Sequence, residues 1–224
     1  MLKVENIEVF NFEGALRGMR NPMNSWSKSD TRVIIGDLGY EEENSMFSPN
    51  CLQPIVGPND LKLAQTLIRG GAEECKFLRQ IQVSMDISAP RFWWTEMDTY
   101  KVGTTANSCS TMHRLTNAPI TANDFAFEES NSPKIEWIQG HLITQCEELR
   151  QLYVRTKDKK YWRALIETLP NAYIQKRTWT ANYQVLRNIY FQRQGHKLKE
   201  WHEFLDVVDK LPYAEEFISY GTRR

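Results

Sequence analysis

Residues 80–88 read QIQVSMDIS, and this stretch decides what kind of fold the chain adopts. Apolar residues alternate with polar ones along it, at Ile81, Val83, Met85 and Ile87. Successive side chains of a β-strand point to opposite faces, so the alternation predicts a strand with one apolar and one polar face. Such a strand belongs to a sheet that other elements cover on its apolar side.

An aromatic helix is expected directly after this strand. Ser88 suits a helix cap and Pro90 a first helical turn, and the run RFWWTEMDTYK from Arg91 continues the helix to about Gly103. The following strip, TTANSCSTMH at 104–113, contains mainly small and hydrogen-bonding side chains. We predict that this strip is a loop or turn with exposed polar groups.

The spacing of apolar residues places the other elements. Strands are expected at 4–12 and 172–180, a long irregular segment at 24–58, and helices at 57–71, 133–155, 182–196 and 198–211. Asn59 or Asp60 is expected to cap the helix at 57–71. The apolar side of the helix at 133–155 comprises Trp137, Ile138, Leu142, Cys146 and Leu149. We therefore expect an α+β fold with a central antiparallel or mixed sheet flanked by helices, formed by a single domain over residues 1–224.

The composition excludes several classes of protein. The chain has 224 residues, of which 41% are hydrophobic and 25% charged, and 28 basic side chains balance 28 acidic ones. A nucleic-acid binder usually has a basic excess, so polymeric nucleic acid is not expected as a partner. The apolar runs are too short to span a membrane and no signal sequence opens the chain, so we expect a cytoplasmic protein without a membrane partner.

Common metal-binding and nucleotide-binding motifs are missing from the sequence. The four histidines show no H-x-x-x-H spacing and the four cysteines no C-x-x-C pair. A metal site is therefore not expected, and the separated cysteines fit a reducing cytoplasm. The sequence also lacks G-x-x-x-x-G-K-[ST], G-x-G-x-x-G and G-x-S-x-G, so these phosphate-binding loops and the hydrolase elbow are excluded.

Two features remain as candidates for chemistry. The first is TYKVGTTANSCSTMH at 99–113, whose hydroxyl, amide and backbone N–H groups suit a phosphate or the edge of a base. The second is the helix at 182–196, where Asn182 and Arg193 stand at the two ends of an apolar stripe. Polar residues at both ends of such a stripe are unusual for a purely structural face.

The second feature resembles flavin-dependent thymidylate synthases. The stretch LPNAYIQKRTWTANYQVLRNIYFQRQGH at 169–196 matches the family's Leu-Pro, its strand ending in T-x-N, and its helix with a second Asn, a later Arg and a following His-x-x-x-Glu. These residues are here Leu169-Pro170, Thr180-Ala181-Asn182, Asn188, Arg193, and His196 with Glu200. The resemblance covers about residues 57–205 and implies the family's scaffold.

The family's arginine-rich signature, R-H-R-x-x-S-x-[NQ]-E-x-S-x-R-Y, is replaced in this chain. Laid onto the signature, the corresponding residues are Thr99-Tyr100-Lys101, Thr104, Ala106-Asn107, Cys109 and Thr111-Met112. In the family those arginines hold nucleotide and flavin, and a threonine does not replace an always-charged guanidinium. Arg91, Arg163 and Arg187 are candidates to supply the missing charge.

The resemblance implies roles for individual residues. Substrate binding is expected of Thr99, Tyr100, Thr104, Asn107, Ser110 and Arg193, and cofactor binding of Asn182, Asn188, Arg193 and His196. Cys109 is a candidate catalytic nucleophile for C6 of a pyrimidine, and Lys101 is the nearest cation in sequence that would favour its thiolate. A small residue packed under a loop is the other interpretation of Cys109.

By this resemblance we expect a homotetramer that binds FAD and transfers a one-carbon unit to C5 of a pyrimidine deoxynucleotide, converting dUMP to dTMP or making a related modification. NADPH and methylenetetrahydrofolate would be the other reactants. The alternative is a non-catalytic nucleotide- or flavin-binding descendant of the scaffold with a regulatory or interaction role. The lost arginines favour this alternative, whereas their polar replacements favour the enzyme.

Overall fold

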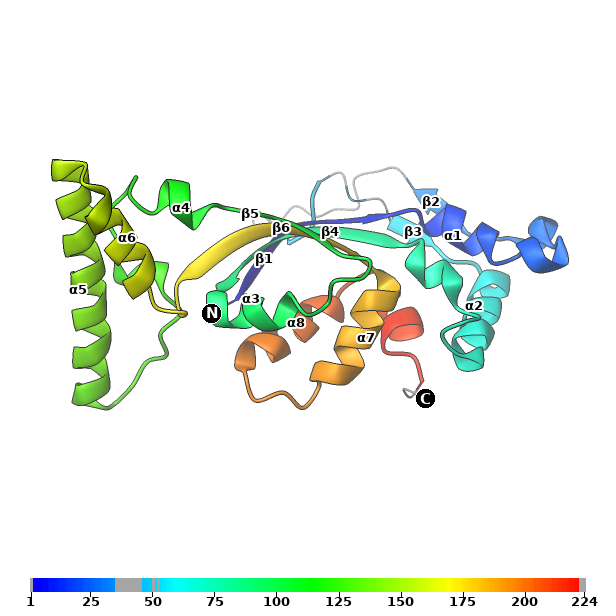
Figure 1. Cartoon of the computed structure of the whole chain (residues 1–224). Helices are drawn as coiled ribbons and strands as arrows, with labels where there is room; N and C mark the ends of the chain where they lie inside the picture. The colour runs from blue at the N-terminus through cyan, green and yellow to red at the C-terminus, as the bar shows by residue number, and fades with distance from the viewer. Residues whose placement is uncertain (1, 35–45, 50, 52, 222–224) are drawn as a thin grey trace. The chain divides into compact units, whose positions relative to one another are not determined.

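The computed structural model describes residues 2–34, 46–49, 51 and 53–221 (Figure 1). The chain forms two compact units. Unit 1 contains Ser88–Thr99 and Asn107–Arg177, and unit 2 contains Leu2–Ile87, Tyr100–Ala106 and Thr178–Arg224. The single domain expected over residues 1–224 stays a prediction. Part of the irregular segment expected at 24–58 lies outside the described residues.

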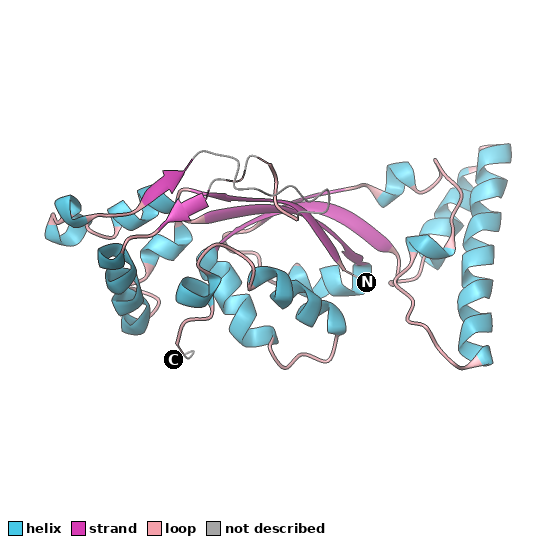
Figure 2. Cartoon of the chain, turned by 180° about the vertical axis from the view of Figure 1, so that it is seen from behind, coloured by secondary structure: helices cyan, strands magenta, loops and turns pink. Residues whose placement is uncertain are grey.

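Four strands form the main sheet, in the order β1-β4-β6-β5. These strands are β1 (Lys3–Phe10), β4 (Gln82–Pro90), β5 (Thr105–Ser108) and β6 (Ile174–Asn182). The alternation in β4 is confirmed, because Val83, Met85 and Ile87 are all fully buried. A separate antiparallel pair joins β2 (Arg32–Ile34) to β3 (Gln53–Ile55). Helices and strands together confirm the α+β prediction (Figure 2).

Unit 2 packs its helices around large buried aromatic residues. The helical elements are α1 (Phe12–Gly18), η1 (Asn21–Met23), η2 (Trp26–Lys28), α2 (Pro58–Gly70), η3 (Lys76–Arg79), α7 (Tyr183–Arg193), α8 (Lys199–Val208) and η5 (Ala214–Ile218). In both views α7 and α8 lie on the same side of the sheet. Tyr183, Trp201 and Phe217 are fully buried, so the aromatic side chains of these elements form much of the core of unit 2.

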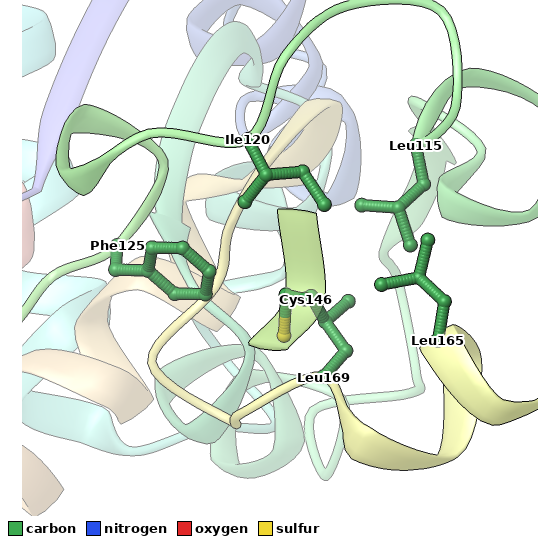
Figure 3. Packing of buried hydrophobic residues seen from close by; sticks show 6 residues of the cluster. All are labelled: Leu115, Ile120, Phe125, Cys146, Leu165 and Leu169. Carbon is green, nitrogen blue, oxygen red and sulfur yellow. The ribbon is translucent and has the colours of Figure 1, made fainter. Parts of the chain in front are cut away.

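Unit 1 has its own apolar cluster. Its helical elements are α3 (Arg91–Met97), α4 (Thr111–Arg114), η4 (Ala122–Asp124), α5 (Pro133–Thr156) and α6 (Lys159–Thr168). Figure 3 shows how the side chains of the cluster point toward one another: Leu115, Ile120, Phe125, Cys146, Leu165 and Leu169.

The apolar side predicted for α5 is only half correct. Cys146 is fully buried and Leu149 packs against the cluster of unit 1. Trp137 and Ile138 are instead 67% and 42% exposed. The α5 residues that join the cluster begin at Ile143. Trp137 and Ile138, in the first turns of the helix, are not part of this cluster, although their spacing predicted burial.

The strip after α3 was predicted incorrectly as a loop. Ser88 and Pro90 are still in β4, and α3 ends at Met97 rather than near Gly103. The polar strip then contains β5 and the short α4. β5 is a strand because it pairs with β6. The hydrogen bonding to β6 continues beyond the end of β5, where the Cys109 N–H donates to the Lys176 carbonyl at 2.9 Å.

The start of α2 is capped by a residue from a distant part of the sequence. The carboxylate of Asp30 accepts hydrogen bonds from the backbone N–H groups of Asn59 and Asp60, both at 3.0 Å. The predicted cap residues therefore do not cap their own helix, and Asp60 has another role. Its carboxylate accepts from Arg20 Nε at 2.7 Å, and the two side chains are 0% and 4% exposed.

Asp60 is held in its charged form inside unit 2. Burial alone would raise its pKa, but hydrogen bonds from Thr31, Arg20 and Ser29 outweigh burial and hold the pKa below its ordinary value. A buried charge that loses its partner is strongly destabilising. The Arg20–Asp60 pair therefore joins the turn after α1 to α2.

Replacing Asp60 by Asn should destabilise unit 2 by about 3 kcal/mol or more, because Arg20 would keep a buried charge without a counter-charge. The free energy of unfolding in urea measures this loss. The exposed Asp206→Asn in α8 is the matched control and should change stability by less than about 0.5 kcal/mol. Equal effects of the two variants would show that the buried pair contributes no special stability.

In unit 1, Glu147 pairs with an arginine, as Asp60 does in unit 2. Its carboxylate accepts from Arg150 Nε at 2.7 Å, from the Ile120 N–H at 2.8 Å and from Gln151 Nε2 at 2.9 Å. The Arg150 hydrogen bond is the main cause that lowers the pKa of Glu147 from 4.5 to about 2, against the opposing effect of burial.

This lowered pKa predicts an acid-sensitive contribution to stability. A carboxyl whose pKa is lower in the folded state stabilises the fold above its unfolded pKa, here 4.5, and loses that effect as the pH falls toward about 2. Glu147→Gln should therefore cost on the order of 2 kcal/mol at pH 7 and progressively less below pH 4.5. Urea unfolding at several pH values tests this, with the exposed neighbour Glu148→Gln as control; a loss independent of pH would contradict it.

Candidate functional site

The two candidate features of the sequence meet within unit 2. The Tyr100 hydroxyl donates to Gln192 Oε1 at 2.8 Å and accepts from Arg193 Nε at 2.9 Å. Gly103 adopts a φ of 76°, and a Cβ built there would lie 2.8 Å from Asn182 Nδ2. Only glycine tolerates both the left-handed backbone and this close approach. The segment 100–104, here called the strip segment, is thereby fixed against α7.

Arg193 is oriented by two aromatic rings. Its Cζ lies 4.4 Å from the centre of the Trp201 ring and 5.4 Å from that of Tyr100. A guanidinium over aromatic faces is attracted by their electron density, and the half-buried position strengthens that attraction. Tyr100 and Trp201 thus hold this cation in a defined place at the end of α7.

Two further predicted residues make contacts that shape α7. Asn182 is buried at the start of the helix, where its Oδ1 accepts from the Val185 N–H at 3.0 Å. His196 lies beyond the end of α7, and its Nδ1 accepts from the Leu198 N–H at 3.1 Å. These contacts define the start of α7 and the turn toward α8, and a ligand role for either residue stays a prediction.

Asn188, the remaining predicted cofactor residue, lines a cavity of unit 2. The cavity has a volume of about 430 Å³, within the range of small-molecule sites. It lies between α2 and α7, and Tyr220 and Gly221 also line it. Its lining is formed by Ile68, Arg69, Gly71, Ala72, Cys75, Gln184, Arg187, Asn188, Tyr220 and Gly221.

The charges of this cavity favour an electron-rich ligand. Arg187 is half-buried, which lowers its pKa from the ordinary value, and its Nη1 donates to the carbonyls of Ile218 at 2.8 Å and Tyr220 at 2.7 Å. Arg69 is hydrogen-bonded to the Tyr220 hydroxyl. The described residues of the lining include two guanidinium groups and no carboxylate. Anionic or carbonyl oxygens suit such a lining.

Four predicted residues belong to unit 1. Thr99 donates through Oγ1 to the Glu96 carbonyl at 2.7 Å, and Ser110 caps α4 by accepting from the His113 N–H at 3.3 Å. Asn107 in β5 is exposed. Cys109 is also exposed, and its carbonyl accepts from Gln175 Nε2 at 2.9 Å, so pairing with β6 fixes its backbone.

The predicted residues Lys101 and Thr104 belong to the strip segment of unit 2. Lys101 is exposed, and Thr104 is half-buried with its Oγ1 donating to the Tyr100 carbonyl at 2.5 Å. The catalytic roles of Lys101 and Cys109, and the binding roles of the other strip residues, stay predictions. The structure shows, in addition to these predictions, that the strip segment contacts α7.

The cavity brings one candidate replacement arginine together with residues that the sequence did not single out. Arg187 lines the cavity, whereas Arg163 forms an exposed ion pair with Glu167 on α6. Gln184 lies one helical turn before Asn188, a spacing that would have indicated its position. No local sequence pattern predicts that Cys75 lines the cavity, because the turn that contains Cys75 is brought to the cavity by tertiary packing.

The described part of the chain has neither a membrane-spanning helix nor a metal-binding cluster. None of its helices has the length and apolar character needed to cross a membrane. Nor does that part contain a group of three or more His, Cys, Asp or Glu side chains arranged to hold a metal ion.

Comparison with known proteins identifies the fold. No protein-family model matches the sequence, and no curated protein matches it. Flavin-dependent thymidylate synthase ThyX of Helicobacter pylori, solved with FAD and dUMP, matches with a TM-score of 0.68 and 16% identity over 96% of this chain and 97% of that chain. A second structure of ThyX from that organism with FAD and dUMP gives a TM-score of 0.69 and 16% identity over 97% of both chains. The chain therefore has the fold of flavin-dependent thymidylate synthases, which confirms the fold implied by the resemblance in the sequence.

Proposed function

We propose that the protein binds FAD and catalyses a flavin-dependent one-carbon transfer to C5 of a pyrimidine deoxynucleotide such as dUMP. The observation that carries this proposal is the cavity at Asn188, in a chain whose fold matches an enzyme solved with FAD and dUMP over 96% of its length. NADPH and methylenetetrahydrofolate as the other reactants, a homotetramer and a cytoplasmic location are further parts of the proposal.

The donors of the cavity fit a flavin cofactor. FAD offers carbonyl oxygens on its ring and a pyrophosphate, and both accept hydrogen bonds. Asn188, Gln184 and Arg187 supply amide and guanidinium donors, and no carboxylate of the described lining would repel the phosphates. Asn188 and Arg187 would hold FAD, with Gln184 beside Asn188, and reduced flavin would supply the hydride for the transfer.

The strip segment and Arg193 would bind the nucleotide. Two rings already fix the Arg193 guanidinium, so little side-chain entropy is lost when it contacts a phosphate or a base carbonyl. Thr99, Asn107 and Ser110 belong to unit 1, and the sequence resemblance alone proposes them as substrate residues, with neutral donors or acceptors that suit the edge of a base. Such residues recognise the ligand with less charge than the family's arginine signature provides.

Cys109 is proposed as the nucleophile that activates the pyrimidine. Addition of its thiolate to C6 would make C5 electron-rich, and the exposed position leaves the side chain accessible to a substrate. Lys101 is proposed to favour the thiolate. Both roles belong to the same proposal as the one-carbon transfer.

The flavin part of the proposal predicts a yellow protein with FAD absorbance nearly stoichiometric with the chain. Asn188→Ala should weaken FAD binding about fivefold, because one hydrogen bond to the ligand is worth on the order of 1 kcal/mol. Equilibrium dialysis measures the dissociation constant. The control is Asn117→Ala, an exposed asparagine of unit 1. A protein that stays colourless after incubation with FAD would contradict the proposal and favour a non-catalytic role.

The nucleophile part predicts that Cys109→Ser abolishes turnover of dUMP while FAD stays bound, since a serine hydroxyl is a much weaker nucleophile at neutral pH. Product formation and flavin absorbance are measured on the same sample. Cys51→Ser, at a half-buried cysteine of unit 2, serves as control and should retain turnover. Unchanged turnover in Cys109→Ser would exclude this cysteine as the nucleophile.

A further inference from the structure

Three polar side chains form a continuous hydrogen-bonded series along the wall of the cavity. The Cys75 thiol donates to Gln184 Oε1 at an Sγ–Oε1 distance of 3.2 Å. Gln184 Nε2 donates to Asn188 Oδ1, also at 3.2 Å. All three residues line the cavity, and Cys75 comes from the turn before η3 while the other two lie on α7. We call this series the Cys75 relay.

The chemistry of Cys75 gives the relay a direction. Cys75 is 2% exposed, and its burial raises the pKa of the thiol, so the sulfur keeps a proton to donate. The Gln184 side-chain oxygen accepts a hydrogen bond from this thiol, so the NH₂ group of Gln184 faces the next turn of α7. Asn188 accepts there through its own oxygen, so its NH₂ group is the donor end of the relay.

We propose that Cys75 and Gln184 are positioning residues that make Asn188 a hydrogen-bond donor toward the cavity, which therefore selects a ligand group with acceptor atoms. This inference rests on the proposed function, in which the ligand is FAD. The acceptor is either the carbonyl edge of the flavin ring or the pyrophosphate. The two arginines of the lining act in the same sense, because guanidinium groups donate hydrogen bonds and accept none.

The direction of the relay is tested by comparing two substitutions of Asn188. Asn188→Ala removes the donor, and Asn188→Asp replaces it with a carboxylate that only accepts. If the ligand presents acceptors, Asn188→Asp should bind FAD about tenfold more weakly than Asn188→Ala, because acceptor would face acceptor. FAD binding by Asn188→Asp as tight as in Asn188→Ala or tighter would overturn the proposal. Asn117→Asp in unit 1 controls for the added charge.

The positioning role is tested at Cys75. Cys75→Ala removes the donor and should weaken FAD binding about threefold to tenfold, whereas Cys75→Ser keeps a hydroxyl donor and should restore affinity to within about twofold of the wild type. The melting temperature of each variant is measured alongside. Wild-type affinity in Cys75→Ala, or equal weakening in both Cys75 variants, would show that the thiol only fills space and would overturn the relay.

Repeating the Asn188 titrations with two probes identifies the acceptor. Riboflavin has the carbonyl edge of the flavin ring but no pyrophosphate, and ADP has a pyrophosphate but no flavin ring. A selective loss for Asn188→Asp with either probe supports the relay and identifies the acceptor. Wild-type protein that binds ADP but not FAD would contradict the proposed function while still testing the relay. Wild-type protein that binds none of the three probes would overturn both.

Discussion

The contact between Gly103 and Asn182 is the constraint on which the candidate nucleotide site depends. A Cβ atom at position 103 would lie 2.8 Å from the Asn182 amide nitrogen. Because the backbone there also has a φ of 76°, only glycine fits this position. Eleven residues after Asn182, at the end of α7, the Tyr100 hydroxyl binds Arg193, a residue 93 positions away in sequence. These two contacts hold the strip segment along the length of the helix.

Helix α7 presents two different faces, each with residues of the candidate site. Arg193 belongs to the face that meets the strip segment, whereas Gln184 and Asn188 belong to the face that lines the cavity. Residues 188 and 193 are separated by about 140° around a helix with 3.6 residues per turn. The buried Leu186 and Ile189 anchor the same helix in the core of unit 2. One element can therefore hold the residue proposed to bind the cofactor and the residue proposed to bind the nucleotide in fixed relation.

Periodicity predicted the elements whose neighbours match their own apolar pattern. β4 alternates in sequence and in burial, and α7 begins where the T-x-N motif indicated. β5 was missed because its polar residues have no period, and its pairing with β6 is a tertiary interaction. The cap of α2 was missed for the same kind of reason, since Asp30 is distant in sequence. Conversely, Trp137 and Ile138 have the spacing of a buried face and yet are exposed.

The candidate site was predictable to a similar extent. The family resemblance singled out Asn188 and Arg193, and the structure places the first at a cavity and the second against two aromatic rings. Cys75 could not be found from its neighbours in sequence, because it meets Gln184 only when η3 packs near α7. Hydrogen-bond direction along the relay also depends on burial, which a sequence does not specify.

The cavity between α2 and α7 is proposed to bind FAD through Asn188. A crystal structure of the protein grown with saturating FAD would test this assignment. Flavin or pyrophosphate density with an acceptor atom about 3 Å from Asn188 Nδ2 is the expected result. FAD bound elsewhere on the protein, with no contact to Asn188, would contradict the assignment.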